Sequence, residues 1–544
     1  MSHVGVYLRM LRVVTGNAIN YCGGWFIMKN LFFSILFLGV TFIASALDNA
    51  PGLSKVQQKL VLFPIEHYNQ DVNYWLNPKA SAYQSNLLSV DYQKRKLSEL
   101  EHIYYGTDAR DRSPWSREYI ISLLASQPHL QLVEAWLIDE LAHYNTTARL
   151  TPAEQQKINY GINFRPYAKA WFDNVRDNMQ LPKLAQIHYD EDMRAITTDN
   201  VHLRSLPSDD PLFYNSAIAG EGYPFDNLQQ TAVFAGTPLY VISVSLDHKW
   251  DLVVSPNYVG WIHAQSVGFV DDNFVDLWQA HAYNGLVGVT ASNISILNRY
   301  GQYQFTGYVG MLFPLTNNYA SRGSHVHLLQ SQMHGAVRIL IPLKDTTGHA
   351  ILGEATLSAS EAAVLPLIAS PANFALIIKH LQGRAYGWGN INFYNDCSSE
   401  LKSIYTLFGI FLPRNTSNQL RAGKVIDLNN LTPPQRLQYL MQHGVPLLTL
   451  VYIKGHILLY VGTYSNKDGR KFALSYQEMW GLKPQDLSYR AVVGQSVFLP
   501  LLPSYPEDKK LWSQAAFATF KLIYLNQPST QSDPFRFNLL ELTR

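Results

Sequence analysis

The chain lacks an excess of charge of either sign. Asp, Glu, Lys and Arg make up only 15% of its 544 residues, and the formal net charge is +2. This balance argues against nucleic acid as a partner, because binding to a phosphate backbone draws on clustered Lys and Arg. A hydrophobic content of 47% argues equally against a disordered chain. The length allows roughly three to five domains, each with its own core.

Long uncharged apolar runs are also scarce, and the one near the start extends from Leu31 to Ala46. It follows Met28-Lys29-Asn30 and closes with Ala-Ser-Ala, a pattern typical of a secretory signal peptide. The run is shorter than the roughly 20 apolar residues of a spanning helix, which makes an uncleaved anchor the weaker alternative. We therefore expect an exported protein of the periplasm or cell envelope, with no stable membrane span after cleavage near Leu47. Translation from Met28, without residues 1–27, is an open alternative.

Cysteine is scarce, and the two cysteines are expected to differ in fate. Cys22 lies in the segment expected to be removed, so the mature chain keeps Cys397 as its only thiol. Residues 1–46 carry three basic and no acidic side chains, so the rest has 40 basic and 41 acidic ones and a net charge of −1. In a compartment that oxidises thiol pairs, a single remaining cysteine suggests a reactive one. No cysteine stands at the expected cleavage site, so a lipid anchor is not expected.

The passage around Cys397 has the features of a nucleophile at a helix start. A glycine-rich loop that begins at Tyr386 leads into it. Four apolar residues follow at helical spacing, Leu401, Ile404, Tyr405 and Phe408. Asp396 is the natural N-cap, and the free amide groups and positive dipole end of the first turn would favour a Cys397 thiolate. A buried structural thiol is the alternative.

A base and an orienting group follow on two strand-like runs. His456 lies on the apolar run from Val451 to Val461, and Gln477 on the next run, from Phe472 to Gly481. An imidazole could take the thiol proton, and a neighbouring polar group could hold the ring in place. Asn, Gln or Glu at neighbouring positions could do what we expect of Gln477, and a hydrogen-bonded core histidine is the alternative for His456.

These passages resemble the NlpC-type cell-wall peptidases. That family carries a Tyr-x-Trp-Gly loop, Asp-Cys-Ser before a helix, Gly-Ile-x-Leu-Pro-Arg after it and Gly-His on a later strand, and all four stand here in that order. Two positions depart from the family pattern. Gln477 stands where the family usually has His, although Gln can still accept and donate hydrogen bonds. Ser399 stands where many members have Gly, which would narrow the space beside the nucleophile.

The resemblance implies a thiol protease that acts on murein stem peptides or muropeptides and needs no cofactor. It implies cleavage between γ-D-glutamate and the diamino acid, with the Tyr386 hydroxyl and the Cys397 N–H meeting the oxyanion. By the same resemblance, Asp396, Ser398 and Thr416 would bind the free amine of L-alanine. A murein-binding protein without activity, and an amidase or acyltransferase on the same Cys-His core, are the rival functions. The oligomeric state is open.

The remainder of the chain divides by pattern. Residues from about 51 to 181 show helical periodicity and resemble the N-terminal stabilising domain of one NlpC subgroup. Short β runs follow, among them Pro238 to Val244, Trp250 to Val254 and Tyr258 to His263, which suggest an SH3-like barrel. A second β-rich segment suggests another barrel. His325 and His327 could share one strand face as zinc ligands with His334, but that spacing is unconvincing, so no metal is expected.

One loop of the first barrel is too aromatic for a plain linker. It reads Gly-Glu221-Gly-Tyr223-Pro-Phe-Asp226 and resembles a loop motif of the first bacterial SH3-like domain in the same subgroup. The resemblance implies that Glu221, Tyr223 and Asp226 contribute to substrate binding, and a self-packed loop is the alternative. Loops carry function more often than scaffolds do.

The expected fold is thus multidomain α+β. Its predicted parts are a signal region (1–46), a helical stabilising domain (47–190), a first SH3-like barrel (195–278), a second one (279–355), a papain-like NlpC cysteine peptidase domain (360–503) and a C-terminal tail (504–544).

Overall fold

The computed structural model describes most of the chain after residue 58. The described residues are 59–106, 111–126, 128–215, 222–316, 335–486, 488–531, 534–535 and 539–543. The expected signal region with Cys22, the loop residue Glu221 and the three histidines His325, His327 and His334 lie outside them. Among the described residues, no helix combines the length and the apolar character that crossing a membrane requires.

The first part of the described chain is mainly helical. Its helices are η1 (Ile65–His67), α3 (Val72–Trp75), α4 (Val90–Tyr104), α5 (Arg117–Leu124), α6 (Leu130–Thr146), α7 (Pro152–Gln155), α8 (Lys169–Asn178), η2 (Leu181–Gln186) and η3 (Glu191–Met193). Thr151 and Glu154 form a capping box at the start of α7, but this helix ends after one turn. The buried Asn159 explains this end, because its side chain donates to Leu141 O of α6 at 2.6 Å and draws the chain out of the helix.

A seven-stranded sheet forms the first barrel. Its strands are β2 (Arg194–Thr197), β3 (Val201–Arg204), β4 (Gln229–Val233), β5 (Pro238–Val244), β6 (Trp250–Val254), β7 (Val259–His263) and β8 (Val267–Phe269), and η4 (Ala264–Ser266) precedes β8. The strand order is β4-β3-β7-β6-β5-β2-β8. The three β runs predicted from the sequence are confirmed as β5, β6 and β7, and their apolar side chains fill one core.

Three small sheets follow the first barrel. They contain β9 (Leu286–Val289), β10 (Ile294–Leu297), β11 (Tyr303–Gly307), β12 (Leu312–Pro314), β13 (Val337–Lys344), β14 (Ala350–Leu357) and β15 (Ala362–Val364). The helix α9 (Asp272–Asn284) precedes them, and the expected boundary between residues 278 and 279 falls inside it. The helix continues because Phe274, Trp278 and Ala282 form one buried face in the largest core of the molecule.

The last part of the chain is built on a second seven-stranded sheet. Its helices are α11 (Pro371–Leu381), η6 (Trp388–Phe393), α12 (Cys397–Thr406), α13 (Thr416–Gln419), α14 (Pro433–His443), η7 (Gln514–Ala516) and α15 (Leu539–Leu542). Its strands are β16 (Lys424–Asp427), β17 (Thr449–Ile453), β18 (His456–Ser465), β19 (Lys471–Leu482), β20 (Tyr489–Leu501) and β21 (Phe520–Tyr524). The predicted helix after Asp396 is confirmed as α12 with its side-chain cap, and Ser370 caps α11 in the same way.

The large sheet draws strands from both ends of the described chain. Its order is β1-β20-β19-β18-β17-β21-β16, in which β1 (Lys59–Leu62) pairs in parallel with β20. The sheet therefore extends past the predicted boundary at residue 503, since β21 pairs with both β17 and β16. Phe520, Leu522 and Ile523 are fully buried, which explains why this segment joins the sheet instead of forming a separate tail.

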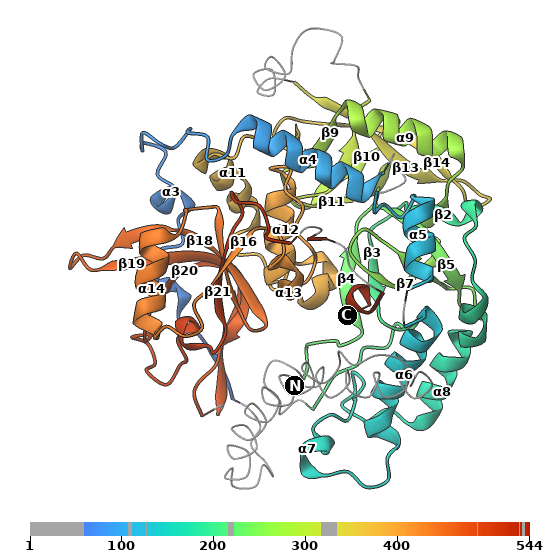
Figure 1. Cartoon of the computed structure of the whole chain (residues 1–544), viewed down its shortest axis with the longest axis horizontal. Helices are drawn as coiled ribbons and strands as arrows, with labels where there is room; N and C mark the ends of the chain where they lie inside the picture. The colour runs from blue at the N-terminus through green and yellow to red at the C-terminus, as the bar shows by residue number, and fades with distance from the viewer. Residues whose placement is uncertain are drawn as a thin grey trace, which may run out of the picture. The chain divides into compact units, whose positions relative to one another are not determined.

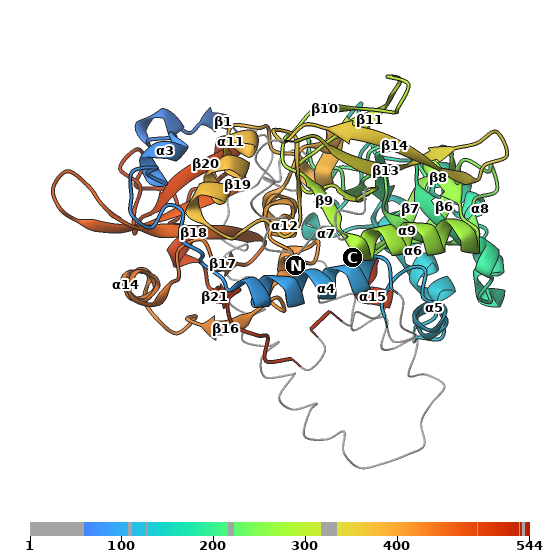
Figure 2. The same cartoon turned by 90° about the horizontal axis from the view of Figure 1, so that it is seen from above.

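The helix α12 lies between the large sheet on one side and the first barrel with the three small sheets on the other (Figures 1 and 2). One core joins α4, α9, α11, α12 and the strands of the large sheet, with Leu97, Trp278, Phe374, Tyr405 and Ile523 among its members. Gly409 ends the helical segment at φ +80°, where a Cβ atom would stand 3.0 Å from the Cβ of Leu97 on α4. This close approach fixes α12 in position from its C-terminal end.

Candidate active site

Cys397 opens α12 and is 7% exposed. The carboxylate of Asp396 accepts hydrogen bonds from the N–H groups of Ser398 at 3.1 Å and Ser399 at 3.0 Å, so it is the predicted N-cap. The Ser399 hydroxyl accepts from the Asp396 N–H at 2.8 Å and completes a capping box. Ser399 stands two residues after Cys397, on the opposite side of the helix, and so does not narrow the space at the thiol.

The predicted base and its orienting group lie on neighbouring strands. His456 begins β18 and Gln477 lies on β19, and His456 Nε2 is 2.7 Å from Gln477 Oε1. The Gln477 amide nitrogen donates to Ser475 Oγ at 2.9 Å, which leaves the carbonyl oxygen toward the ring. A carbonyl oxygen only accepts, so Nε2 carries the proton and Nδ1 keeps a lone pair. This tautomer is the one that can take a proton from a thiol.

A second glutamine holds the first one. Gln514 Nε2 donates to Gln477 Oε1 at 2.7 Å, and Gln477 Nε2 lies 3.1 Å from Gln514 Oε1. Both side chains are buried. Gln514 comes from η7, between β20 and β21, in the segment that the sequence predicts to be a C-terminal tail. We missed it because its partner lies 37 residues away and no local pattern relates the two.

The electrostatic surroundings favour a neutral pair of Cys397 and His456. Burial, followed by the nearby Asp396 carboxylate, raises the pKa of the Cys397 thiol to about 12. Burial also lowers the pKa of His456, against the opposing effect of the Gln477 hydrogen bond. The thiolate expected from the helix start is therefore not the resting form, because desolvation of a charged sulfur outweighs the amide groups of the first turn.

Tyr386 is half-buried beside the thiol. Burial and the neighbouring Cys397 and Asp396 hold the pKa of its phenol well above the ordinary value. The phenol therefore keeps its proton and can donate a hydrogen bond. Its ring lies 6.2 Å from that of Trp480 and 6.5 Å from that of Phe225, between centroids.

Asp396 is bound by a buried arginine that the sequence motif alone did not assign. Arg414 Nη2 lies 2.6 Å from Asp396 Oδ2 and Nη1 lies 3.0 Å from Oδ1, a bidentate pair. Nη1 also donates to Ser398 Oγ at 2.8 Å. Burial alone would raise the pKa of Asp396, but the Arg414 guanidinium holds it below the ordinary value. The carboxylate predicted to receive a substrate ammonium thus already has a cation beside it, while half-buried Thr416 begins α13 two residues further on.

The loop of the first barrel meets the catalytic loop through Phe225. Its ring lies edge-on to Trp388 at 5.4 Å and to Trp480 at 5.3 Å, and Trp388 Nε1 donates to Asp226 O at 3.0 Å. Of the three loop residues predicted to bind substrate, Tyr223 and Asp226 are described, and both have other partners. Asp226 uses one carboxylate oxygen for Arg204 and the other for two backbone N–H groups. Tyr223 is 54% exposed and packs against Phe164 and Phe213.

Two buried carboxyl groups, Glu400 and Glu478, lie near the site, and no sequence pattern predicted them. Glu400 Oε1 accepts from Tyr476 at 2.6 Å and from Ser496 at 2.8 Å, and Ser496 Oγ also contacts Glu478. The Ser496 hydroxyl has one proton and can donate to only one of the two carboxyl groups. The second contact therefore requires a proton on one of the carboxyl groups. Burial raises the pKa of both, and the Glu400 charge raises that of Glu478 further. Among the described residues, no group of three His, Cys, Asp or Glu side chains could hold a metal ion.

Comparison with known proteins agrees with this geometry. Residues 211–263 match the family model of an SH3 domain of the SH3b1 type. A solved NlpC/P60 endopeptidase from Photobacterium damselae subsp. piscicida is similar over 87% of this chain and 100% of its own, with 25% identity and a TM-score of 0.70. An NlpC/P60 family protein from Bacillus cereus shows 16% identity over 59% of this chain and 98% of its own, with a TM-score of 0.37. No curated protein matches the chain.

The chain is an NlpC/P60-type protein. It carries a bacterial SH3-like domain ahead of the part that holds Cys397, His456 and Gln477.

Proposed function

We propose that this protein is an exported cysteine endopeptidase of bacterial cell-wall peptides. The observation that supports it most is the 2.7 Å contact between His456 Nε2 and Gln477 Oε1, which leaves Nδ1 unprotonated on the strand that faces the start of α12. The neighbour from Photobacterium, described as an NlpC/P60 endopeptidase, supports the same class of reaction. Periplasm or cell envelope is the proposed location.

In the proposed mechanism, Cys397 Sγ attacks the peptide carbonyl carbon while His456 Nδ1 takes the thiol proton. Because the pKa of Cys397 is raised, proton transfer accompanies the attack instead of preceding it. The Cys397 N–H and the Tyr386 hydroxyl donate to the oxyanion. The imidazolium then returns its proton to the departing amine and leaves a thioester. Water, deprotonated by His456, hydrolyses the thioester and regenerates the thiol.

The proposed substrate is a murein stem peptide, cut between γ-D-glutamate and the diamino acid. The Phe225, Trp388 and Trp480 rings supply an apolar contact surface where the first barrel meets the catalytic loop. In this proposal Ser398, Thr416 and the charge-matched Asp396–Arg414 pair lie on the side that receives the L-alanine end. Since Asp396 is neutralised by Arg414, we expect only modest preference for a free ammonium over an amide there.

The test is incubation of the purified chain with free L-Ala-γ-D-Glu-diaminopimelate and with the same peptide linked to glycan, followed by mass spectrometry. We expect L-Ala-D-Glu and free diaminopimelate from the wild type and no product from Cys397→Ala or His456→Ala. His443→Ala, which changes an exposed histidine on α14, is the matched control and should keep full activity. Murein binding by the wild type without product would favour a silent binding protein, and a different scissile bond would favour an amidase or acyltransferase.

A further inference from the structure

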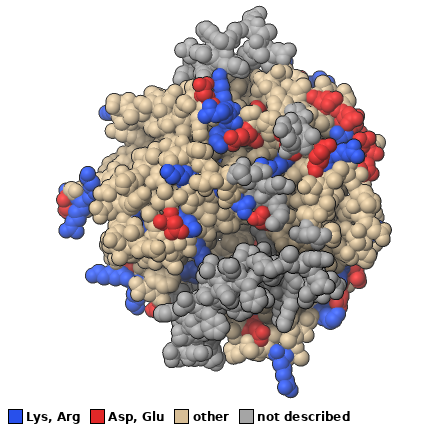
Figure 3. Space-filling view, viewed as in Figure 1, with Lys and Arg blue, Asp and Glu red and all other residues tan. Residues whose placement is uncertain are grey.

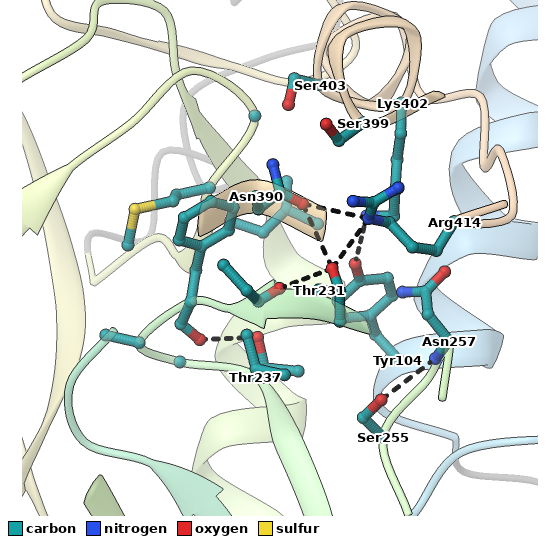
Figure 4. Close-up of a pocket in the computed structure, with 18 of the residues that line it drawn as sticks. Tyr104, Thr231, Thr237, Ser255, Asn257, Asn390, Ser399, Lys402, Ser403 and Arg414 are labelled. Carbon is teal, nitrogen blue, oxygen red and sulfur yellow. Dashed lines mark hydrogen bonds between the residues drawn. The ribbon is translucent and has the colours of Figure 1, made fainter. Parts of the chain in front are cut away.

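A cavity lies on the side of α12 that faces away from the large sheet (Figure 4). Ser399, Lys402 and Ser403 of α12 line it, whereas Leu401 and Ile404 on the other side of the helix pack into the core. The opposite walls come from α4, the first barrel and the loop before β12. The cavity opens to solvent at its mouth, and the empty space counted together with that open mouth is about 700 Å³.

The walls of this cavity are closely fitted backbone and not loose surface loops. Gly310, in the loop before β12, has φ +89°, and a Cβ there would stand 2.8 Å from the Cα of Ser403. A larger residue would push the loop off the helix. The fold therefore keeps these segments together at a fixed separation around the cavity.

The charge of the lining is positive and partly unmatched. Lys402 and Arg414 line the cavity, and no Asp or Glu does. Arg414 is neutralised by Asp396. The half-buried Lys402 ammonium lies 3.1 Å from the Tyr104 hydroxyl, and within the described part of the chain no carboxylate lies within 4 Å of it. A cation in a partly desolvated site without a counter-charge favours an anionic ligand.

A hydrogen-bond acceptor on the facing wall adds a second requirement. Asn257 Oδ1 is buried and has no hydrogen-bond partner among the described residues. Buried polar atoms are normally paired, so this oxygen calls for a donor from something that enters the cavity. Figure 4 shows Asn257 and Lys402 on different elements that line the same space.

We propose that this cavity binds a small molecule with a carboxylate and a nearby N–H donor, as in a free amino acid or a short peptide. The carboxylate pairs with Lys402, and the N–H donates to Asn257 Oδ1. Cys397 is not among the residues that line the cavity, and binding can be measured without turnover, so the proposal does not depend on the proposed peptidase activity. Because Ser399, Asn390 and Arg414 also line the cavity and hold the start of α12, occupancy stabilises the joint between the first barrel and that helix.

The experiment measures binding to the full chain by calorimetry and by the shift in unfolding temperature. The probes are D-alanyl-D-alanine, its C-terminal amide, and inorganic phosphate, each with wild type and with Cys397→Ala to exclude turnover. We expect the dipeptide to bind and to raise the unfolding temperature, and its amide to bind at least ten-fold more weakly. Binding of phosphate with no binding of the dipeptide would overturn the proposal, as would equal binding of dipeptide and amide.

Variants then assign the binding to the cavity. Lys402→Gln and Asn257→Leu should each weaken dipeptide binding at least ten-fold and leave peptidase activity unchanged. Lys379→Gln, which changes an exposed lysine on α11, is the matched control and should bind as the wild type does. Unfolding temperatures without ligand show whether each variant is folded. Undiminished dipeptide binding by folded Lys402→Gln would place the ligand elsewhere and refute the proposal.

Discussion

The polar groups on the two sides of Cys397 are stabilised in opposite ways. On one side of the cysteine, Asp396 and Arg414 carry full opposite charges and form a bidentate pair. On the other side, Gln477 and Gln514 are neutral amides. Burial favours the neutral forms of His456, Glu400 and Glu478, because it lowers the pKa of the imidazole and raises the pKa of the two carboxyl groups. At a similar degree of burial, a side chain keeps its charge only where an opposite charge contacts it. The few charges on the surface in Figure 3 lie singly or in small groups of mixed sign.

Removing the Arg414 cation from the charged side should have the largest effect on stability and activity. Arg414→Met leaves the buried Asp396 carboxylate without its partner, so we expect a loss of roughly 3–5 kcal/mol in the free energy of unfolding and loss of activity. Urea denaturation measures the first quantity. Arg470→Met, at an exposed hairpin position, should change it by less than about 0.5 kcal/mol. If the charge mismatch is the cause, adding Asp396→Asn to Arg414→Met should restore part of the stability.

Removing the Gln477 amide, on the neutral side, should have a smaller effect than removing the Arg414 cation. Gln477→Ala removes the acceptor for His456 Nε2–H, and we expect kcat to fall on the order of ten- to a thousand-fold. Gln477→His should keep substantial activity because an imidazole nitrogen can accept the same hydrogen bond. Steady-state kinetics on the free tripeptide decides this. Unchanged kcat in Gln477→Ala would show that another residue holds the ring.

Gln514 should contribute a smaller share through Gln477. Gln514→Leu removes both amide hydrogen bonds to Gln477, and we expect kcat to fall about three- to ten-fold with KM unchanged, since Gln514 contacts the orienting group and not the thiol. The pH profile of kcat/KM should also shift as the imidazole loses its fixed tautomer. Gln531→Leu, an exposed position, is the control. A rise in KM alone would contradict a positioning role.

The smallest effect concerns pH. The pKa of Glu478 is raised in the folded protein, so its contribution to stability is complete below the unfolded value of about 4.3 and is lost as pH rises through the folded pKa. Glu478→Gln cannot ionise, so the free energy of unfolding should fall less between pH 5 and pH 8 than it does in the wild type. Exposed Glu66→Gln should follow wild type. Parallel curves for Glu478→Gln and wild type would show that this carboxyl group is not held protonated.

The sequence predicted part of the charged side of the site, where Asp396 lies, and much less of the neutral side. Asp396 and Cys397 were found because a cap and a first turn are local features, and His456 because it follows glycine on an apolar strand. We did not predict the roles of Gln514, Glu400 and Glu478, because these depend on contacts between strands and helices far apart in sequence. The same limit applies to the fold, where helix starts were predicted and β1 and β21 were not.

The position of β21 has a consequence for when the protein becomes functional. This strand lies between β17 and β16, and Gln514 stands just before it. A chain exported from its N-terminus, as proposed above, would therefore deliver Cys397 and His456 first and complete the sheet last. Contacts of such long sequence separation form slowly. In that case a partly exported chain would hold the proposed nucleophile and base without β21 and without the Gln514 amide. Under the proposed export and peptidase activity, the order of the strands would delay cleavage until almost the whole chain has left the compartment where it was made.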